Sequence, residues 1–306
     1  MNIQELKNEI LKEKERTNTL ILAHNYQRSE ILEIADICGD SFLLSKVARD
    51  ASNTRVLMCG VSFMGETVKI LSPEKEVILS CADATCPMAD QIEVERVIEY
   101  KKEHPDHAIC AYINTNSDLK AVADVCVTSS SAVKIVNALP QKDILFLPDK
   151  NLGAYVASQC PDKNVHLMDG YCPIHNYVLP KHIKEMKVKY PKALVAIHGE
   201  CPMDTLKLAD MVGSTKEIIE YAKENVNDEI IFVTERGVCE YMQMLYPNRS
   251  FYQLVPDILT CPNMKKTTLT GVLNALKGTG GKIIELDEDA RLNALSSIEK
   301  MLNYGG

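Results

Sequence analysis

The chain has 306 residues, 46% of them hydrophobic, and carries a formal net charge of −8. This length supports more than one hydrophobic core, and the acidic balance argues against nucleic acid or an anionic membrane as a main partner. No apolar run approaches the roughly 18–20 residues of a spanning helix, and the charged N-terminal segment lacks the apolar core of a signal peptide. We therefore expect a cytoplasmic protein without a membrane or nucleic-acid partner.

Short apolar runs alternate with helical patterns along the whole chain. The runs predict buried strands at 19–23, 55–59, 76–79, 108–112, 143–147, 164–168, 193–197, 229–233 and 250–254. The helical patterns predict helices at 3–16, 30–37, 41–49, 63–71, 87–102, 117–122, 130–138, 152–158, 180–189, 215–224, 237–245, 265–277 and 286–303. Turns are predicted at 39–41 and 128–129. Such alternation predicts an α/β protein whose parallel sheets are flanked by helices.

Three segments of the chain align without gaps. They start at His24, Tyr112 and His198, each closing an apolar run, and an Ala-Asp pair begins 11 positions later in every copy. A hydroxyl residue follows at 17 positions in each copy, namely Ser41, Ser129 and Thr215. Three features in three copies indicate an internal repeat of about 87 residues, the size of a small domain. We expect three pseudo-symmetric αβα domains at 1–104, 105–190 and 191–280, with the helix at 286–303 packing near the first.

Three of the eleven cysteines follow the same period. Cys86, Cys172 and Cys261 come 62, 60 and 63 positions after the three repeat starts, and each precedes proline. An arbitrary cysteine is more often a small buried hydrophobe, and Cys160 and Cys201 also precede proline, so only the repeat phase distinguishes these three. His175 makes a Cys-x-x-His pattern with Cys172, which is a weak zinc signal and leaves His175 a possible cavity residue.

The repeat predicts one shared site. In parallel α/β sheets, ligands bind beyond the carboxyl ends of the strands. We expect each cysteine loop to follow the third strand of its repeat, so that it emerges at the same edge as the end of the first strand. A threefold axis would then bring the three edges together. The hydroxyl residues are expected near helix N-termini, which favour anions. Three thiolates suit an iron–sulfur cube with one open iron better than four-coordinate structural zinc, and that iron is a Lewis acid suited to expelling water.

At this point the sequence resembles the quinolinate synthase family over nearly its whole length. The resemblance rests on these motifs: His24-Asn25-Tyr26-Gln27, Gly39-Asp40-Ser41, Phe63-Met64-x-Glu66-Thr67-Val68-Lys69-Ile70-Leu71, Ala84-Thr85-Cys86, Tyr112-x-Asn114, Asp124-x-x-Val127-Thr128-Ser129, Pro148-Asp149-Lys150-Asn151-Leu152, Cys172-x-x-His175, His198-x-Glu200-Cys201 and Cys261-x-x-Met264-Lys265.

The resemblance implies three αβα domains around a central [4Fe-4S] cluster held by Cys86, Cys172 and Cys261. It implies condensation of iminoaspartate with dihydroxyacetone phosphate to quinolinate, phosphate and two waters, and a functional link to the enzyme that makes iminoaspartate. It implies a substrate-binding set of His24, Ser41, Tyr112, Asn114, Ser129, His198, Glu200 and Thr215, to which we add Ser214. Catalytic roles are expected for Glu200, Tyr26, His24 and Tyr112, with Glu200 and Tyr26 in proton transfer.

Two other classes of function remain open at the sequence level. One is a different hydro-lyase that uses the same open iron on another small acid. The other is a non-catalytic cluster protein such as an iron or redox sensor, which has no use for His24, Tyr112, His198 and Glu200 in phase. A zinc protein is a further alternative that metal analysis distinguishes.

Overall fold

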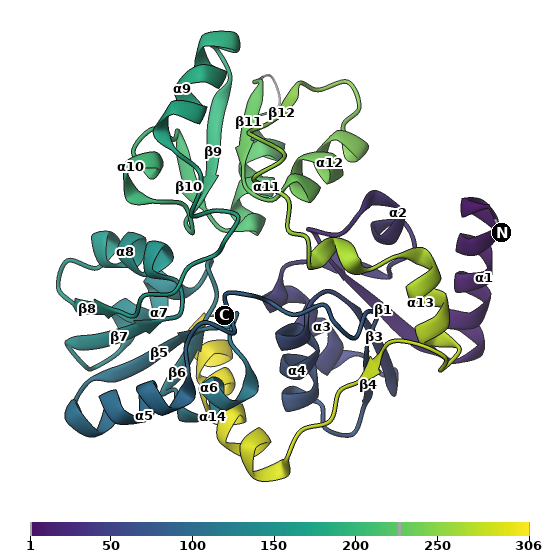
Figure 1. Cartoon of the computed structure of the whole chain (residues 1–306), viewed down its shortest axis with the longest axis horizontal. Coiled ribbons are helices and arrows are strands. Elements are labelled where there is room, and N and C mark those ends of the chain that lie inside the picture. Colours follow the sequence, from purple (N-terminus) through teal and green to yellow (C-terminus); the bar gives the residue numbers. More distant parts are fainter. Residues whose placement is uncertain (1, 226–227, 306) are drawn as a thin grey trace. The chain divides into compact units, whose positions relative to one another are not determined.

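The computed structural model describes residues 2–225 and 228–305. Two compact units make up the fold (Figure 1): unit 1 is Met1–Cys86 with Cys261–Leu295, and unit 2 is Pro87–Thr260 with Ser296–Gly306. Each unit is described by itself below.

Unit 1 is built on one sheet of five strands. Their order is β13 (Lys282–Ile283), β4 (Glu76–Leu79), β3 (Arg55–Cys59), β1 (Thr19–His24) and β2 (Ile37–Gly39). Its helices are α1 (Ile3–Arg16), α2 (Ser29–Leu32), α3 (Ser41–Asp50), α4 (Ser62–Leu71), the 3₁₀ turn η1 (Met264–Lys266), α13 (Leu269–Leu276) and the start of α14 (Glu288–Gly305). Helices α1 and α13 pack against each other, as do α3 and α4 (Figure 1).

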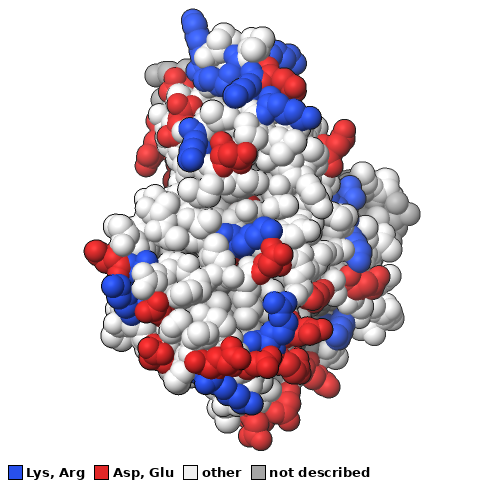
Figure 2. Space-filling model, turned by 60° about the vertical axis from the view of Figure 1, so that its left-hand side comes forward, with Lys and Arg blue, Asp and Glu red and all other residues white. Residues whose placement is uncertain are grey.

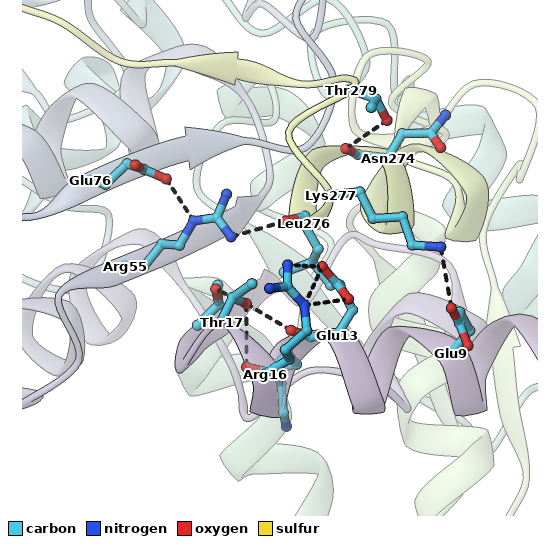
Figure 3. A network of polar contacts seen from close by, with 12 residues as sticks. Glu9, Glu13, Arg16, Thr17, Arg55, Glu76, Asn274, Leu276, Lys277 and Thr279 are labelled. Atoms are coloured by element: carbon cyan, nitrogen blue, oxygen red, sulfur yellow. Dashed lines mark hydrogen bonds and ion pairs between the residues drawn. The ribbon is translucent and has the colours of Figure 1, made fainter.

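The returning C-terminal segment is fastened to the start of the chain within this unit (Figure 3). Lys277, just after α13, pairs with Glu9 of α1 at 3.2 Å. Arg55 of β3 donates to the Leu276 carbonyl at 3.0 Å and pairs with Glu76 of β4 at 2.6 Å. These contacts hold the segment that follows Cys261 on the first sheet.

Unit 2 contains two sheets of four strands. One has the order β6 (Val125–Val127), β5 (Ala108–Tyr112), β7 (Asp143–Leu147) and β8 (Asn164–Leu167). The other has the order β10 (Met211–Gly213), β9 (Leu194–His198), β11 (Ile230–Val233) and β12 (Phe251–Gln253). The helices are α5 (Val94–Glu103), α6 (Ser117–Val122), α7 (Ala132–Ala138), α8 (Lys150–Gln159), α9 (Pro180–Lys189), α10 (Met203–Leu206), α11 (Thr215–Glu224), α12 (Arg236–Leu245) and the end of α14.

All three sheets follow one plan. Numbered within each repeat, the strands lie in the order second, first, third, fourth, and every pair among these four is parallel. The central strands are buried on both faces, which is why they read as continuous apolar runs. The prediction of an α/β fold with three helix-flanked parallel sheets is confirmed, with one addition, because β13 joins β4 antiparallel.

The recurrent Ala-Asp pair has a structural role in every repeat. The carboxylates of Asp36, Asp124 and Asp210 each accept a hydrogen bond of 2.8 Å from a backbone N–H in the first strand of their sheet. The N–H of each Asp returns a bond of 2.9–3.0 Å to the carbonyl of that same strand residue. These two bonds pair the backbone N–H and carbonyl of the first-strand residue just before the edge strand begins, where an unpaired buried backbone group would be costly.

A basic side chain also recurs, 51 positions after each repeat start. Lys75, Lys163 and Arg249 each donate to two carbonyls at or just after the C-terminal end of an earlier helix of the same repeat, α3, α7 or α11. A cation is favoured there because the last carbonyls of a helix have no partner in the helix and give it partial negative charge. The basic residue directly precedes β4 and β8 and comes two residues before β12, so its bonds fix the start of the fourth strand against the helix layer.

Several predicted boundaries are wrong for the same reason. Residues 37–39, 125–127 and 211–213 form the short edge strands β2, β6 and β10, where a helix end, a turn or connecting chain was expected. Three residues are too few for a periodic pattern, and only pairing with the neighbouring strand defines them. Consequently the three cysteine loops follow the fourth strand of each repeat, not the third.

Two predicted helices differ more. The helix expected at 87–102 begins only at Val94, after irregular chain that contains Pro87. The helix expected at 265–277 is split into η1 and α13, and Thr268 caps the second part through its side chain. The closing helix spans Glu288–Gly305; in unit 1 its Arg291 donates to the Ile70 carbonyl, and in unit 2 its Ser297 donates to the Lys120 carbonyl.

Charged side chains of both signs share the surface. On the face in Figure 2, Lys and Arg lie among Asp and Glu with uncharged residues between them, so neither sign covers the part of this face that is described. Among the described residues, no helix combines the length and the apolar character that crossing a bilayer requires.

Candidate active site

The residues that start the three repeats end the first strand of each sheet. His24, Tyr112 and His198 are the last residues of β1, β5 and β9, and all three are buried. Their neighbours two positions on, Tyr26, Asn114 and Glu200, lie in the turns that follow. In the two histidine repeats the ring Nδ1 accepts the backbone N–H of that neighbour, at 3.1 Å for Tyr26 and 3.2 Å for Glu200.

Two of the three hydroxyl residues lie at helix starts as expected, but none of the three is the N-cap. The caps are the preceding residues: the Asp40 side chain accepts the Leu43 N–H, and the Ser214 side chain accepts the Glu217 N–H in a reciprocal capping box. Ser41 and Thr215 are instead the first helical residues of α3 and α11. Ser129 lies in a turn before α7, which starts at Ala132.

Unit 1 contains Cys86 and Cys261, two of the three cysteines that follow the repeat period. Cys86 ends the loop after β4, and Cys261 begins the segment leading to η1 and α13; both are partly exposed. Bonds join the residues near them: Lys266 donates to the Asp83 carbonyl at 2.7 Å, and the buried hydroxyls of Ser80 and Thr267 lie 2.9 Å apart.

The same segment reaches the first repeat start. Lys265 donates to the Tyr26 carbonyl at 2.7 Å, and the rings of His24 and Tyr26 meet edge to face with centroids 4.4 Å apart. The fold of unit 1 therefore ties the loops of Cys86, Cys261 and Tyr26 to one another.

Unit 2 places Glu200 at the centre of a buried polar cluster. Its Oε1 accepts the Tyr112 hydroxyl at 2.7 Å, and its Oε2 lies 2.7 Å from His175 Nδ1 and 3.8 Å from His198 Nδ1. Burial opposes ionisation of this carboxyl, but the His198 and His175 imidazoles and the Tyr112 hydroxyl outweigh burial and hold its pKa below the ordinary value. Glu200 is therefore a carboxylate at neutral pH.

His198 is neutral in this site. Burial, reinforced by the neighbouring His175 and opposed by Glu200, lowers the pKa of His198 to about 4. Its Nδ1 accepts the Glu200 N–H, so the remaining proton of the neutral ring is on Nε2. The His175 and His198 rings are stacked with centroids 4.9 Å apart, which fixes both orientations.

His175 connects this cluster to the third phased cysteine. The side chain is fully buried, and its Nδ1 lies 3.3 Å from Cys172 Sγ as well as 2.7 Å from Glu200, while Nε2 lies 3.3 Å from the Thr234 hydroxyl. Cys172, His175 and Glu200 offer ligand atoms within 4.8 Å of one another. The sequence predicted His175 only as a possible cavity residue, because the Cys-x-x-His spacing was its only signal.

A buried aspartate anchors the Cys172 loop. Asp149 accepts the N–H groups of Leu152 at 2.8 Å and Cys172 at 2.9 Å, and burial together with the nearby Glu200 raises its pKa well above the ordinary value. Gly170 packs against the same turn, where an added Cβ would come within 2.5 Å of the Pro148 carbonyl oxygen. The sequence marks Asp149 only as part of a motif, because its buried partners come from distant segments.

Together these observations define an α/β protein with acid–base side chains and partly exposed thiols after the strand ends of its parallel sheets. Tyr112, His198 and Glu200 meet in unit 2, and His24 and Tyr26 meet in unit 1. Such convergence of titratable groups beyond the carboxyl ends of strands is typical of small-molecule enzymes.

Comparison with known proteins gives the family. The family model described as quinolinate synthetase A protein matches residues 8–303. The chain is 47% identical to the quinolinate synthase of Caldicellulosiruptor bescii over 305 residues, covering 100% of both chains. It is 44% identical to that of Clostridium acetobutylicum over 99% of both chains, and 46% identical to that of Clostridioides difficile over 94% of this chain and 95% of the relative. This chain belongs to the quinolinate synthetase A family.

Proposed function

We propose that this protein is a quinolinate synthase of NAD biosynthesis, which condenses iminoaspartate with dihydroxyacetone phosphate to give quinolinate, phosphate and two waters. The family match over nearly the whole chain carries the proposal. The buried Glu200 cluster supports it independently, because ring formation from these substrates requires several proton transfers in a water-poor site.

Cys86, Cys172 and Cys261 are the residues that would hold a [4Fe-4S] cluster. The thiols fit this group, since each is partly exposed, each lies in a loop after the fourth strand of its repeat, and thiolates are the usual ligands of iron–sulfur clusters. When bound, a cluster with three protein ligands supplies an iron that acts as a Lewis acid for dehydration.

Neutral imidazoles and helix starts are proposed to hold the anionic groups of the substrates. The substrates bring two carboxylates and one phosphate. His198 offers Nε2–H as a donor, and His24, whose Nδ1 also accepts a backbone N–H, offers the equivalent donor when neutral. Ser41 at the start of α3 and Ser214 and Thr215 at the start of α11 add hydroxyls where free N–H groups favour anions. Asn114 and Ser129 complete the proposed substrate contacts.

Glu200 is proposed as the base for tautomerisation and ring closure, with Tyr26 as a proton partner. The carboxylate is ionised, and each of its oxygens has one close partner, Tyr112 or His175, so acceptor positions remain for a proton taken from substrate. Tyr112 is placed to relay that proton, because its hydroxyl already donates to Glu200. His175 keeps the carboxylate oriented through the second oxygen.

An anaerobic assay tests the function. Protein with reconstituted cluster is incubated with iminoaspartate and dihydroxyacetone phosphate, and the product is identified by mass spectrometry. We expect quinolinate; a different dehydrated acid would indicate another hydro-lyase, and no product at all would indicate a cluster-binding sensor. The Cys86→Ala variant should lose both brown colour and activity, and retention of either contradicts the ligand assignment.

A further inference from the structure

A second cluster of titratable groups lies at the amino ends of β5 and β7 and beside them on β8, away from the strand ends that carry the candidate active site. It consists of His107, just before β5, Asp143, the first residue of β7, and His166 within β8. The three side chains offer ligand atoms that all lie within 4.8 Å of one another, and all three are at least partly exposed. From this geometry we propose that His107, Asp143 and His166 form a binding site for a divalent late transition metal, with Zn²⁺ as the fitting ion.

The donor set matches this chemistry. Two imidazole nitrogens and one carboxylate oxygen are a common protein ligand set for zinc, which leaves a fourth position to water. Two ligand atoms on one zinc ion lie roughly 3.3 Å apart, because zinc binds N and O at about 2.0–2.1 Å with tetrahedral angles. His166 Nε2 and Asp143 Oδ1 are 3.0 Å apart, which is close to this spacing, so both can bind one ion once the two groups turn toward it and their mutual hydrogen bond is released.

Neighbouring groups orient the ligands. The Tyr100 hydroxyl lies 2.8 Å from His107 Nδ1, which leaves Nε2 as the ligand nitrogen when the tyrosine oxygen accepts the Nδ1 proton. Asn164 donates to Asp143 Oδ1 at 3.0 Å and steadies the carboxylate. The rings of His107 and His166 are stacked with centroids 4.9 Å and planes 20° apart, so one ring has to turn for both lone pairs to meet at one ion; His104 stacks on His107 at 4.6 Å. A hydrogen bond at the second ring nitrogen, such as the one to Tyr100, is typical of metal-binding histidines.

The site would fasten three adjacent strands of one sheet. In the order β6-β5-β7-β8, the ligands come from or directly precede β5, β7 and β8, and β8 is an edge strand whose side chains are largely exposed. A bound ion therefore ties down the exposed edge, and because it binds the folded form it raises stability by mass action. It lies at the opposite end of β5 from Tyr112, so the proposed catalysis does not depend on it.

The test is zinc binding by the cluster-loaded protein under anaerobic conditions. Wild-type protein and variants are dialysed against micromolar Zn²⁺, and bound zinc is counted by mass spectrometry. We expect His166→Gln, His107→Gln and Asp143→Asn each to bind one equivalent less than wild type. Tyr100→Phe should bind that equivalent about 10- to 100-fold more weakly, as for other second contacts.

The control is His182→Gln, which removes a histidine at the start of α9 and should keep the full equivalent. Equal zinc in wild type and His166→Gln would overturn the proposal, as would an equal loss in His182→Gln. Since His166 is 44% exposed, its variant should fold normally and keep full quinolinate-forming activity. An anomalous difference map at the zinc edge should place the ion between His107, Asp143 and His166, and a peak elsewhere would also contradict the site.

Discussion

Two clusters in unit 2 use the same residue types at the two ends of β5 and differ in burial. At the carboxyl end, Tyr112 joins Glu200 and His198, whose side chains are 5% and 2% exposed. At the amino end, His107 joins Asp143 and His166, whose side chains are 31% and 44% exposed. In the buried cluster, burial lowers the pKa of His198 to about 4, whereas in the exposed cluster hydrogen bonds from His166 and Asn164 are the main cause of the lowered pKa of Asp143. Burial, more than residue type, sets the chemistry of each cluster.

The largest expected effect follows from replacing the buried carboxylate. Glu200→Gln keeps the shape and an acceptor for Tyr112 but cannot take a proton, so we expect quinolinate formation to fall by about 10²–10⁴-fold. Single-turnover assays at matched cluster content measure this loss. The exposed counterpart Asp143→Asn serves as the control and should retain full activity. A native rate in Glu200→Gln would refute the base assignment.

The buried cluster should also make stability depend on pH. His198 binds a proton with a pKa near 6.5 when unfolded and about 4 when folded, so the unfolded state binds more protons between these values. Its stabilising contribution is therefore present above pH 6.5 and is lost as the pH falls toward 4, by up to about 3 kcal/mol. The lowered pKa of Glu200 acts in the same direction at lower pH.

Urea unfolding of the cluster-free protein at pH 7.5 and pH 5 measures this dependence. His198→Gln should flatten it, while His166→Gln in the exposed cluster should leave the slope unchanged. An equal pH dependence of the free energy of unfolding in His198→Gln and His166→Gln would contradict the role of burial.

A smaller effect is expected where the buried cluster meets the Cys172 loop. Gly170→Ala brings a Cβ within 2.5 Å of the Pro148 carbonyl oxygen, so the backbone has to shift, at a cost of about 1–3 kcal/mol. The loop then carries Cys172 away from Asp149, and iron content after reconstitution should fall. Gly278→Ala is the comparison for backbone strain without a clash: an added Cβ there meets nothing within 4 Å, its positive φ makes the change destabilising, and iron content should stay unchanged. Unchanged iron content and stability in Gly170→Ala would argue against this anchoring role.

The smallest effect is expected in the exposed cluster without added metal. Asp143→Asn removes a partly exposed contact between a carboxylate and His166, and such contacts contribute little because water and salt screen them. We expect no measurable change in the free energy of unfolding in the presence of a chelator. Added zinc should then stabilise the wild type but not the variant, and a large loss in chelator would show that the pair acts without metal.

Much of the fold was predictable because it is encoded locally and three times. The strands at Ala108–Tyr112 and Asp143–Leu147 and the helix at Pro180–Lys189 were predicted with their observed bounds, since buried apolar runs and helical spacing are visible over five residues or more. The basic residue at 51 positions is a further signal of the repeat in the sequence. The candidate site was predicted in part: Tyr112, His198 and Glu200 do meet, whereas His175 was only a possible cavity residue and Asp149 was not assigned to the site.

The sequence by itself determined the threefold repeat, the strand and helix alternation and the phase of Cys86, Cys172 and Cys261, because each depends on residue type at fixed spacing. Tertiary structure decided the edge strands β2, β6 and β10, the antiparallel β13 and the partners of Glu200. These depend on which distant segments meet, as when His175 from the loop after β8 reaches the turn after β9. Tertiary structure also set the pKa of His198, because desolvation depends on all the chain that surrounds the ring, of which its sequence neighbours are a small part.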